Sequence, residues 1–237
     1  MCRSTALERL YECAAARSAA INPGSPLPPA AVEELKKLMV AVPLEELGFR
    51  SSAIKDPRSA LPLPGSPRRA REGTTSAVTY IHIFENRHLT LGMFCFPEGA
   101  CIPLHDHPGM TVLSRLLFGT LRVRSYDFAV EGAYPEVGDT VEVMFKANAT
   151  VRAPASTPLV LFPTDGGNIH EFVAETPCAV LDLLVPPYCS GEARDCTYYE
   201  EAEPAARVPG DTGVLQAIEQ PPWFTVLHAD YTGVPIS

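Results

Sequence analysis

The stretch Gly99-Ala-Cys-Ile-Pro-Leu-His105-Asp-His107-Pro-Gly109 determines how the rest of this sequence is interpreted. Its two histidines are one residue apart, and in an extended chain residues at this spacing point to the same face of a strand. A third histidine, His170, follows Asp165-Gly-Gly-Asn-Ile and begins another strand-like run. Three imidazoles brought together in this way can hold one metal ion. Imidazole suits iron, zinc, copper and nickel, so the residues alone do not select the metal.

From Val78 onward the sequence has the pattern of an all-β domain. Short runs that alternate between apolar and polar residues, or are wholly apolar, are separated by Gly, Pro, Asn or Asp. Many short strands at this spacing predict a sandwich or a barrel of the jelly-roll kind, a class that includes the double-stranded β-helix of the cupin group. The runs begin at Val78, Leu89, Gly119, Val141, Leu159, His170 and Ala179.

Two short helices are predicted before the first strand. Residues 4–18 carry an apolar face at helical spacing. Pro28-Pro29 can open a second helix through Ala30–Val42, where most residues favour a helix. A pair of this length is too short to form a domain, so we expect both helices to pack outside the barrel. A proline-rich loop follows, and its three arginines between residues 68 and 71 are interpreted as solvated charges rather than as part of a substrate entrance.

The composition indicates a globular protein and argues against some functions. The 237 residues are enough for one domain with a full core, and their net charge is −9. A nucleic-acid-binding protein usually has a basic surface, so this balance argues against that class. The seven cysteines are odd in number and include no Cys-x-x-Cys pair. They therefore predict neither a disulfide framework nor a zinc site, and they favour a reducing compartment.

The sequence has no run of apolar residues long enough to span a membrane, and no hydrophobic signal segment near residue 1. By elimination we expect a protein of the cytoplasm, the nucleus or both, without a membrane partner. No coiled-coil seam or internal repeat is evident, so a monomer is expected.

The general cupin pattern has a glycine, a His-x-His pair, a glutamate and a second glycine at fixed spacings. Here Gly99, the two histidines and Gly119 match this pattern, but Val112 (or Thr111) occupies the glutamate position. His170 matches the histidine of the second cupin motif. The anionic fourth ligand of most cupins is therefore missing, and three neutral ligands remain.

Longer stretches of the chain resemble the family of plant cysteine oxidases and cysteamine dioxygenases. Residues 102–127 carry the specific block Pro-Leu-His-Asp-His, and residues 163–170 carry Pro-Thr-Asp-Gly-Gly-Asn-Ile-His. Residues 179–188 and 194–199 add two further matches. The run Leu10-Tyr-Glu-Cys13 is more similar to the plant branch. Together these motifs extend the resemblance over most of the chain.

The resemblance implies a cupin thiol dioxygenase domain at residues 76–237, preceded by an N-terminal helical extension and proline-rich loop at residues 1–75. It also implies that His105, His107 and His170 hold Fe2+. The implied reaction adds both oxygen atoms of dioxygen to the N-terminal cysteine of a protein and gives cysteine sulfinic acid. Three neutral ligands leave the charge of ferrous iron uncompensated, which suits a thiolate and dioxygen as further ligands.

In plants the resembled family acts on transcription factors of the hypoxia response, and on other proteins that begin with Met-Cys, after the methionine is removed. The implied role is therefore oxygen sensing that feeds the arginine/Cys branch of the N-degron pathway. A second hypothesis is a dioxygenase of small thiols, either cysteamine or free cysteine. A third, of another class, is a cupin that binds metal without catalysis. The plant-like N-terminus favours the first hypothesis, and the intact histidines argue against the third.

Four further residues are candidates for the site. Asp182 lies in an otherwise apolar run, where a buried carboxylate needs a partner. It is either a catalytic acid that orients substrate or ligand, as in the family, or a support that bonds a ligand histidine or the backbone. Tyr188 follows two prolines and is either a hydroxyl donor in the site or a packing aromatic. By resemblance, Cys196 and Tyr198 are a possible cross-linked pair.

Two other positions lead to simpler expectations. Asp106 lies between two of the histidines, so strand alternation should point its carboxylate away from the metal. If Met1 is removed, Cys2 becomes an N-terminal cysteine, which makes oxidation of this chain by itself a hypothesis.

Overall fold

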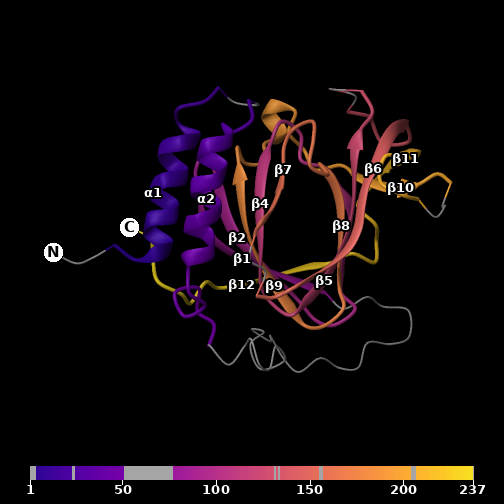
Figure 1. The fold of residues 1–237 in the computed structure, drawn as a ribbon. Helices are drawn as coiled ribbons and strands as arrows, with labels where there is room; N and C mark the ends of the chain where they lie inside the picture. The colour runs from indigo at the N-terminus through magenta and orange to yellow at the C-terminus, as the bar shows by residue number, and fades with distance from the viewer. Residues whose placement is uncertain are drawn as a thin grey trace.

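The structure is a computed structural model that describes residues 4–22, 25–50, 77–130, 132, 134–154, 157–203 and 207–236. The arginines between residues 68 and 71, and the Met1-Cys2 pair, lie outside the described residues. Two α-helices lie against one β-sheet, and a second sheet lies on the far side of the first (Figure 1). Within the described ranges, no helix is both long enough and apolar enough to cross a bilayer.

The two helices form close to the predicted ranges, and each begins with a recognised start signal. Helix α1 (Ala6–Ser18) begins with a capping box, in which the Thr5 hydroxyl accepts the N–H of Glu8 at 3.1 Å. The Glu8 carboxylate in turn accepts the N–H of Thr5 at 2.7 Å. Helix α2 (Pro29–Ala41) begins with proline, whose missing N–H costs nothing at a helix N-terminus.

The first sheet has the strand order β12-β1-β2-β9-β4-β7. Its neighbouring strands are antiparallel, apart from the parallel pair of β1 and β12. Nearly every side chain of β4 and β9 is buried, because one face packs on the helices and the other faces the second sheet. Its strands are β1 (Val78–Glu85), β2 (Thr90–Phe96), β4 (Thr111–Phe118), β7 (Leu159–Leu161), β9 (Cys178–Val185) and β12 (Val226–Ala229).

The second sheet has the order β10-β11-β6-β5-β8-β3, and the pairing of β10 with β3 closes it. Short, mainly antiparallel strands in two facing sheets confirm the predicted all-β cupin barrel. Its strands are β3 (Cys101–His105), β5 (Thr120–Phe128), β6 (Thr140–Arg152), β8 (Ile169–Ala174), β10 (Tyr198–Glu201) and β11 (Thr212–Ile218).

The helices share a core with the first sheet and do not form one of their own. Leu10 and Leu35 are fully buried in one cluster with Leu183 of β9. Arg115 of β4 donates from Nη1 to the carbonyl of Val42 at 2.7 Å, which pairs a carbonyl at the end of α2. Both helices thus cover the outer face of this sheet, as expected, and the interior between the sheets is left for a site (Figure 1).

More of the chain forms strands than the sequence pattern indicated. β4, β10, β11 and β12 were not among the predicted runs, and β6 extends seven residues past the predicted run at 141–145, to Arg152. β12 has no fully buried residue and β11 has only two, so neither has a strong apolar pattern. These strands bring residues 198–201 beside β3, which carries the first of the three histidines.

Candidate metal centre

The structure brings the three predicted histidines together. One ring nitrogen from each of His105, His107 and His170 lies within 4.8 Å of the other two. The three rings are equally spaced, with centroids 4.8 Å apart in each pair. The arrangement follows from register, because His105 at the end of β3 lies directly opposite His170 on β8. His107 follows two residues later on the same side.

Backbone carbonyls hold the imidazoles in one orientation. Nδ1 of His105 lies 2.9 Å from the carbonyl oxygen of Pro103, and Nδ1 of His107 lies 3.0 Å from that of Asn168. The ring of His170 bonds the backbone of Gly167. A carbonyl can only accept, so the bonded nitrogen carries the proton and the other keeps its lone pair. Ligating histidines in metalloproteins are commonly supported in this way.

The histidines are uncharged at neutral pH. Burial lowers the pKa of His105 to about 4, and burial together with the neighbouring His105 lowers that of His107 to about 3. Burial, followed by the two neighbouring histidines, also places the pKa of His170 well below its usual range. Three neutral imidazoles offer three lone pairs without first losing a proton, which favours metal binding.

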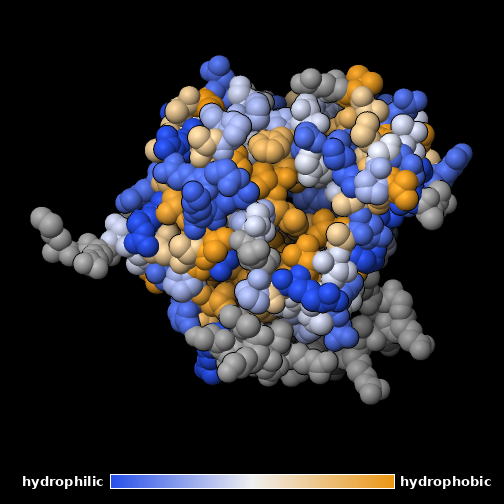
Figure 2. Space-filling view, viewed as in Figure 1, coloured by the Kyte–Doolittle hydropathy of each residue, from blue (hydrophilic) through white to orange (hydrophobic). Residues whose placement is uncertain are grey.

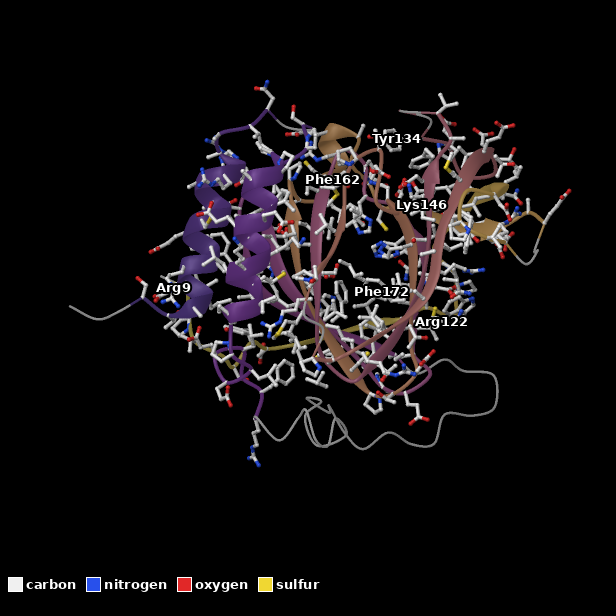
Figure 3. The ribbon with its side chains drawn as sticks, in the orientation of Figure 1. Arg9, Arg122, Tyr134, Lys146, Phe162 and Phe172 are labelled. Carbon is white, nitrogen blue, oxygen red and sulfur yellow. The ribbon has the colours of Figure 1, made fainter. Side chains whose placement is uncertain are left out.

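Two cavities meet at His170 and the ring of Phe172, which stacks on it at 4.5 Å. Phe172 projects into the space between the two sheets (Figure 3). The first cavity, of about 220 Å³, contains all three histidines and Asp182. The second, of about 230 Å³, opens between β4 and β7 on one side and β5 and β6 on the other, and its lining is mostly apolar. Hydrophobic residues accordingly gather at the middle of this face (Figure 2).

Asp182 is buried in the cavity that contains the histidines. It lies on β9 between Gly92 of β2 and Ser114 of β4. Among the described residues, its Oδ1 has no hydrogen-bond partner. Burial raises the pKa of this carboxyl to about 7, and a hydrogen bond with Ser114 opposes the shift. A buried acceptor without a partner is costly, and it marks a position where a ligand with a donor group fits.

Tyr188 also lines this cavity, but its hydroxyl already has a partner. The hydroxyl donates to the backbone carbonyl of Asp106 at 2.7 Å, and the ring lies 5.6 Å from that of His107. The Tyr188 side chain therefore packs on the centre and pins the backbone between His105 and His107.

Cys196 and Tyr198 lie side by side at the same cavity. The Cys196 thiol is within hydrogen-bonding reach of the side chains of Tyr188 and Tyr198. Burial raises the pKa of this thiol to about 12. The ring centroid of Tyr198 lies 6.4 Å from that of His105, its partner across the β3–β10 pairing. A covalent link between the two residues stays a prediction.

Asp106 points away from the histidines, as strand alternation predicts. Its carboxylate is fully buried and accepts the N–H of Thr197 at 2.8 Å and the hydroxyl of Tyr199 at 2.9 Å. It thereby fastens the start of β10, which carries Tyr198, to the loop between the two histidines. The sequence alone did not indicate this role.

Asn168 is a second residue that sequence reasoning missed. It is fully buried; its Oδ1 accepts the N–H of His107 at 3.0 Å and its Nδ2 donates to the carbonyl of His107 at 2.9 Å. The only hint in the sequence is an asparagine after two glycines and just before a histidine. Nothing in that pattern indicates a partner in another segment of the chain.

Comparison with known proteins gives the family. The family model PCO_ADO matches residues 38–236. The chain belongs to the family of plant cysteine oxidases and 2-aminoethanethiol dioxygenases. It is 37% identical over 189 residues to plant cysteine oxidase 1 of Arabidopsis thaliana, which covers 80% of this chain and 61% of that protein. It is 34% identical over 210 residues to mouse 2-aminoethanethiol dioxygenase, which covers 81% of this chain and 77% of that protein.

The chain is also 45% identical to plant cysteine oxidase 2 of Arabidopsis thaliana over 127 residues, and this match covers 54% of this chain and 45% of that protein. The chain thus matches less than two thirds of the length of each of these two plant relatives. Among solved structures, an RmlC-like cupin from Desulfovibrio desulfuricans is 19% identical and has a TM-score of 0.32, over 52% of this chain and 99% of that one.

Proposed function

We propose that this protein is an iron-dependent thiol dioxygenase that oxidises the N-terminal cysteine of proteins to cysteine sulfinic acid. The observation that supports this most is the shared cavity, in which three uncharged imidazoles face one point and Oδ1 of Asp182, which has no hydrogen-bond partner among the described residues, lies beside them. A nitrogen-only donor set fits ferrous iron, among other metals. When bound there, ferrous iron would hold a thiolate and dioxygen side by side and stabilise the charge that develops.

The overall reaction balances without a further reductant. A thiol R–SH and one dioxygen molecule give R–SO2H, in which both new oxygen atoms are bonded to sulfur. Sulfur loses four electrons and dioxygen gains them. The product is on the irreversible part of the cysteine oxidation ladder, which suits a signal that runs in one direction.

The residues of the site have two separate roles in this proposal. His105, His107 and His170 hold the metal without adding negative charge, so an anionic thiolate is attracted. Oδ1 of Asp182 accepts a hydrogen bond from the ammonium group of the substrate. An ammonium group hydrogen-bonded to this carboxyl lowers the carboxyl pKa from about 7 and keeps the group ionised when substrate is bound.

The cavity favours a substrate with an amine and a thiol but no carboxylate nearby. An N-terminal cysteine and cysteamine share this 2-aminoethanethiol unit. Free cysteine adds a carboxylate, and none of the described residues that line the cavity is a lysine or arginine to pair with it. Burial of an unpaired carboxylate is costly, so free cysteine is the weakest of the three candidates.

Similarity to relatives named cysteine oxidases favours a cysteine-containing substrate over cysteamine. Identity is 37% and 45% with the two plant cysteine oxidases and 34% with the mouse 2-aminoethanethiol dioxygenase. Accordingly we propose, as partners, dioxygen and proteins with N-terminal cysteine, such as transcription factors of the hypoxia response after methionine removal. The proposed role is oxygen sensing at the entry to the arginine/Cys branch of the N-degron pathway, in the cytoplasm, the nucleus or both.

The test uses iron-loaded full-length protein and a peptide that begins Cys-Gly-Gly, in air and without oxygen. A gain of two oxygens by mass, about 32 Da, only in air is expected. His170→Ala should abolish it. Asp182→Asn keeps the size of the side chain and should raise the KM for the peptide, because the partner of the ammonium group loses its charge.

Substrate controls distinguish the alternatives. A peptide with an acetylated N-terminus lacks the ammonium group and should react poorly, whereas Asp182→Asn should not slow it further. Sulfinate from cysteamine but not from the peptide would move the assignment to small thiols. Iron-loaded protein that consumes no oxygen with any of these thiols would leave a cupin that binds metal without catalysis.

A further inference from the structure

A carboxylate outside the cavity controls the loop that orients two of the three histidines. Asp127, near the end of β5, is almost fully buried. Its Oδ1 accepts two consecutive backbone N–H groups, those of Gly167 and Asn168, both at 2.8 Å. One carboxylate oxygen therefore fixes the backbone of this loop at two adjacent positions.

The same two loop residues present their carbonyls to the histidines. The Asn168 carbonyl lies 3.0 Å from Nδ1 of His107, and the Gly167 backbone bonds the ring of His170. The N–H groups on one side of this peptide segment are held by Asp127, and the carbonyl groups on the other side hold two imidazoles. A shift of the segment would rotate both rings.

The loop cannot hold this shape by backbone preference alone. Gly166 and Gly167 have φ angles of +86° and +87°, in the left-handed region. A Cβ at Gly167 would lie 2.6 Å from Cβ of Ser125. Glycine allows this conformation, but it also gives the loop backbone the most conformational freedom. A hydrogen-bond acceptor outside the loop is therefore needed to select one arrangement.

The charge of Asp127 is balanced from outside the loop. Nζ of Lys146 lies 3.1 Å from Oδ2 of Asp127 and 2.8 Å from Oδ1 of Asp165. Lys146 contacts the carboxylate oxygen that does not bond the loop. Its removal therefore changes the charge near Asp127 and leaves both N–H bonds in place.

We propose that Asp127 is a positioning residue for the metal centre, acting through the Gly167 and Asn168 peptides on the rings of His170 and His107. The inference rests on the proposed metal-binding role of the histidines. Loss of the acceptor should weaken metal affinity and change the geometry of the bound metal, although Asp127 lies outside the cavity that contains the histidines.

The test is a titration of metal-free full-length protein with Co2+, without air and in competition with a chelator. Visible absorption of Co2+ reports the coordination geometry, and the measurement requires no turnover. Asp127→Ala should lower the Co2+ affinity by at least about tenfold and change the spectrum. Lys146→Met is the matched control, and it should bind Co2+ within about twofold of the parent.

Asp127→Asn is a conservative variant that keeps one acceptor oxygen without its charge. It should recover part of the affinity and the parental spectrum, because neutral acceptors bond N–H groups more weakly. A change in stability alone would not alter the Co2+ spectrum of the metal-saturated variant. If Asp127→Ala does not fold, Asp127→Asn should still bind Co2+ at least about threefold more weakly than Lys146→Met.

The proposal is overturned if folded Asp127→Ala, or in its absence Asp127→Asn, binds Co2+ with parental affinity and spectrum. It is also overturned if the parent protein binds no Co2+. If the parent binds Co2+ and the variants behave as expected, but iron-loaded protein oxidises no thiol, the proposed function fails and the role of Asp127 stands.

Discussion

Asn168 bonds His107 at three points: its side chain accepts the N–H and donates to the carbonyl of His107, and its own carbonyl lies 3.0 Å from the Nδ1 atom. Both the backbone and the ring of one proposed ligand thus depend on a residue from another segment of the chain. Asn168→Ala would leave the N–H of His107 buried and unpaired, and its carbonyl would keep only the N–H of Met110, at 3.2 Å. We expect the free energy of unfolding to fall by about 2–4 kcal/mol, measured by urea unfolding of the metal-free protein.

The matched control for that substitution is Asn148→Ala. Asn148 is an exposed asparagine on β6, and its loss should change the free energy of unfolding by no more than about 0.5 kcal/mol. Equal effects of the two substitutions would contradict the assigned role of Asn168.

Gly167→Ala should be more harmful than an alanine at another glycine with positive φ. The added Cβ would lie 2.6 Å from Cβ of Ser125, in addition to the left-handed φ of +87°. Gly138 has a φ of +98° but open space around it, so Gly138→Ala incurs the conformational cost alone, about 1–2 kcal/mol. Urea unfolding measures the free energy lost by each variant, and the difference between the two losses is the cost of the contact with Ser125. Equal losses would show that this contact has no cost.

Arg115→Met should loosen helix α2 from the barrel. It removes the bonds from the half-buried guanidinium to the carbonyls of Met39, in the last turn of α2, and Val42, which follows the helix. We expect a loss of about 1–3 kcal/mol in the free energy of unfolding, because the carbonyl of Val42 loses the guanidinium while that of Met39 keeps only the N–H of Val42, at 3.3 Å. Arg17→Met is the comparison: Arg17 pairs with Glu34 at 2.6 Å, but both side chains are about half exposed. That exposed pair should contribute less than about 1 kcal/mol.

The pH dependence of stability tests the environment of Asp182. Its pKa is about 7 in the folded protein and near 3.8 in the unfolded chain, so the folded state binds more protons between these values. The carboxyl therefore favours folding fully below pH 3.8, and that contribution is lost as pH rises to about 7. Asp182→Asn should equal the metal-free parent in stability at low pH and exceed it increasingly up to about pH 7, by at most about 4 kcal/mol.

Asp165→Asn should change stability in the opposite direction in the same measurement of pH dependence. Lys146 holds the pKa of the Asp165 carboxyl below its usual range, so its contribution to stability is present at neutral pH and is lost on acidification. The asparagine variant should therefore be the less stable protein at neutral pH, by a small amount because Asp165 is exposed. For Asp182, the contradicting result would be a difference in the free energy of unfolding between the parent and Asp182→Asn that stays the same at every pH.

The sequence was sufficient to predict the parts of the site that depend on strand alternation and local pattern. His105 and His107 share one face because they are two residues apart on an extended segment, and Asp106 points the other way for the same reason. The buried position of Asp182 followed from its apolar neighbours. These features depend on period-2 geometry, which is visible in a single segment.

The features that were not predicted depend on contacts between distant segments. Asn168 and Asp127 are polar residues whose partners lie 61 and 40 residues away, and no local pattern encodes such a pairing. Strand β12 has no buried residue to indicate a strand, and its place is given by its parallel pairing with β1. The hydroxyl of Tyr188 was expected either in the site or in packing, and its bond to a backbone carbonyl was not foreseen.

The pairing of β3 with both β8 and β10 has a consequence for the order in which the protein is made. The first two histidines leave the ribosome well before His170, and Tyr198 follows later still. Contacts between such distant segments form slowly, because a long loop must close before they are gained. A partly synthesised chain therefore holds only a two-histidine fragment, and the full set of nitrogen donors exists only after most of the barrel has been translated.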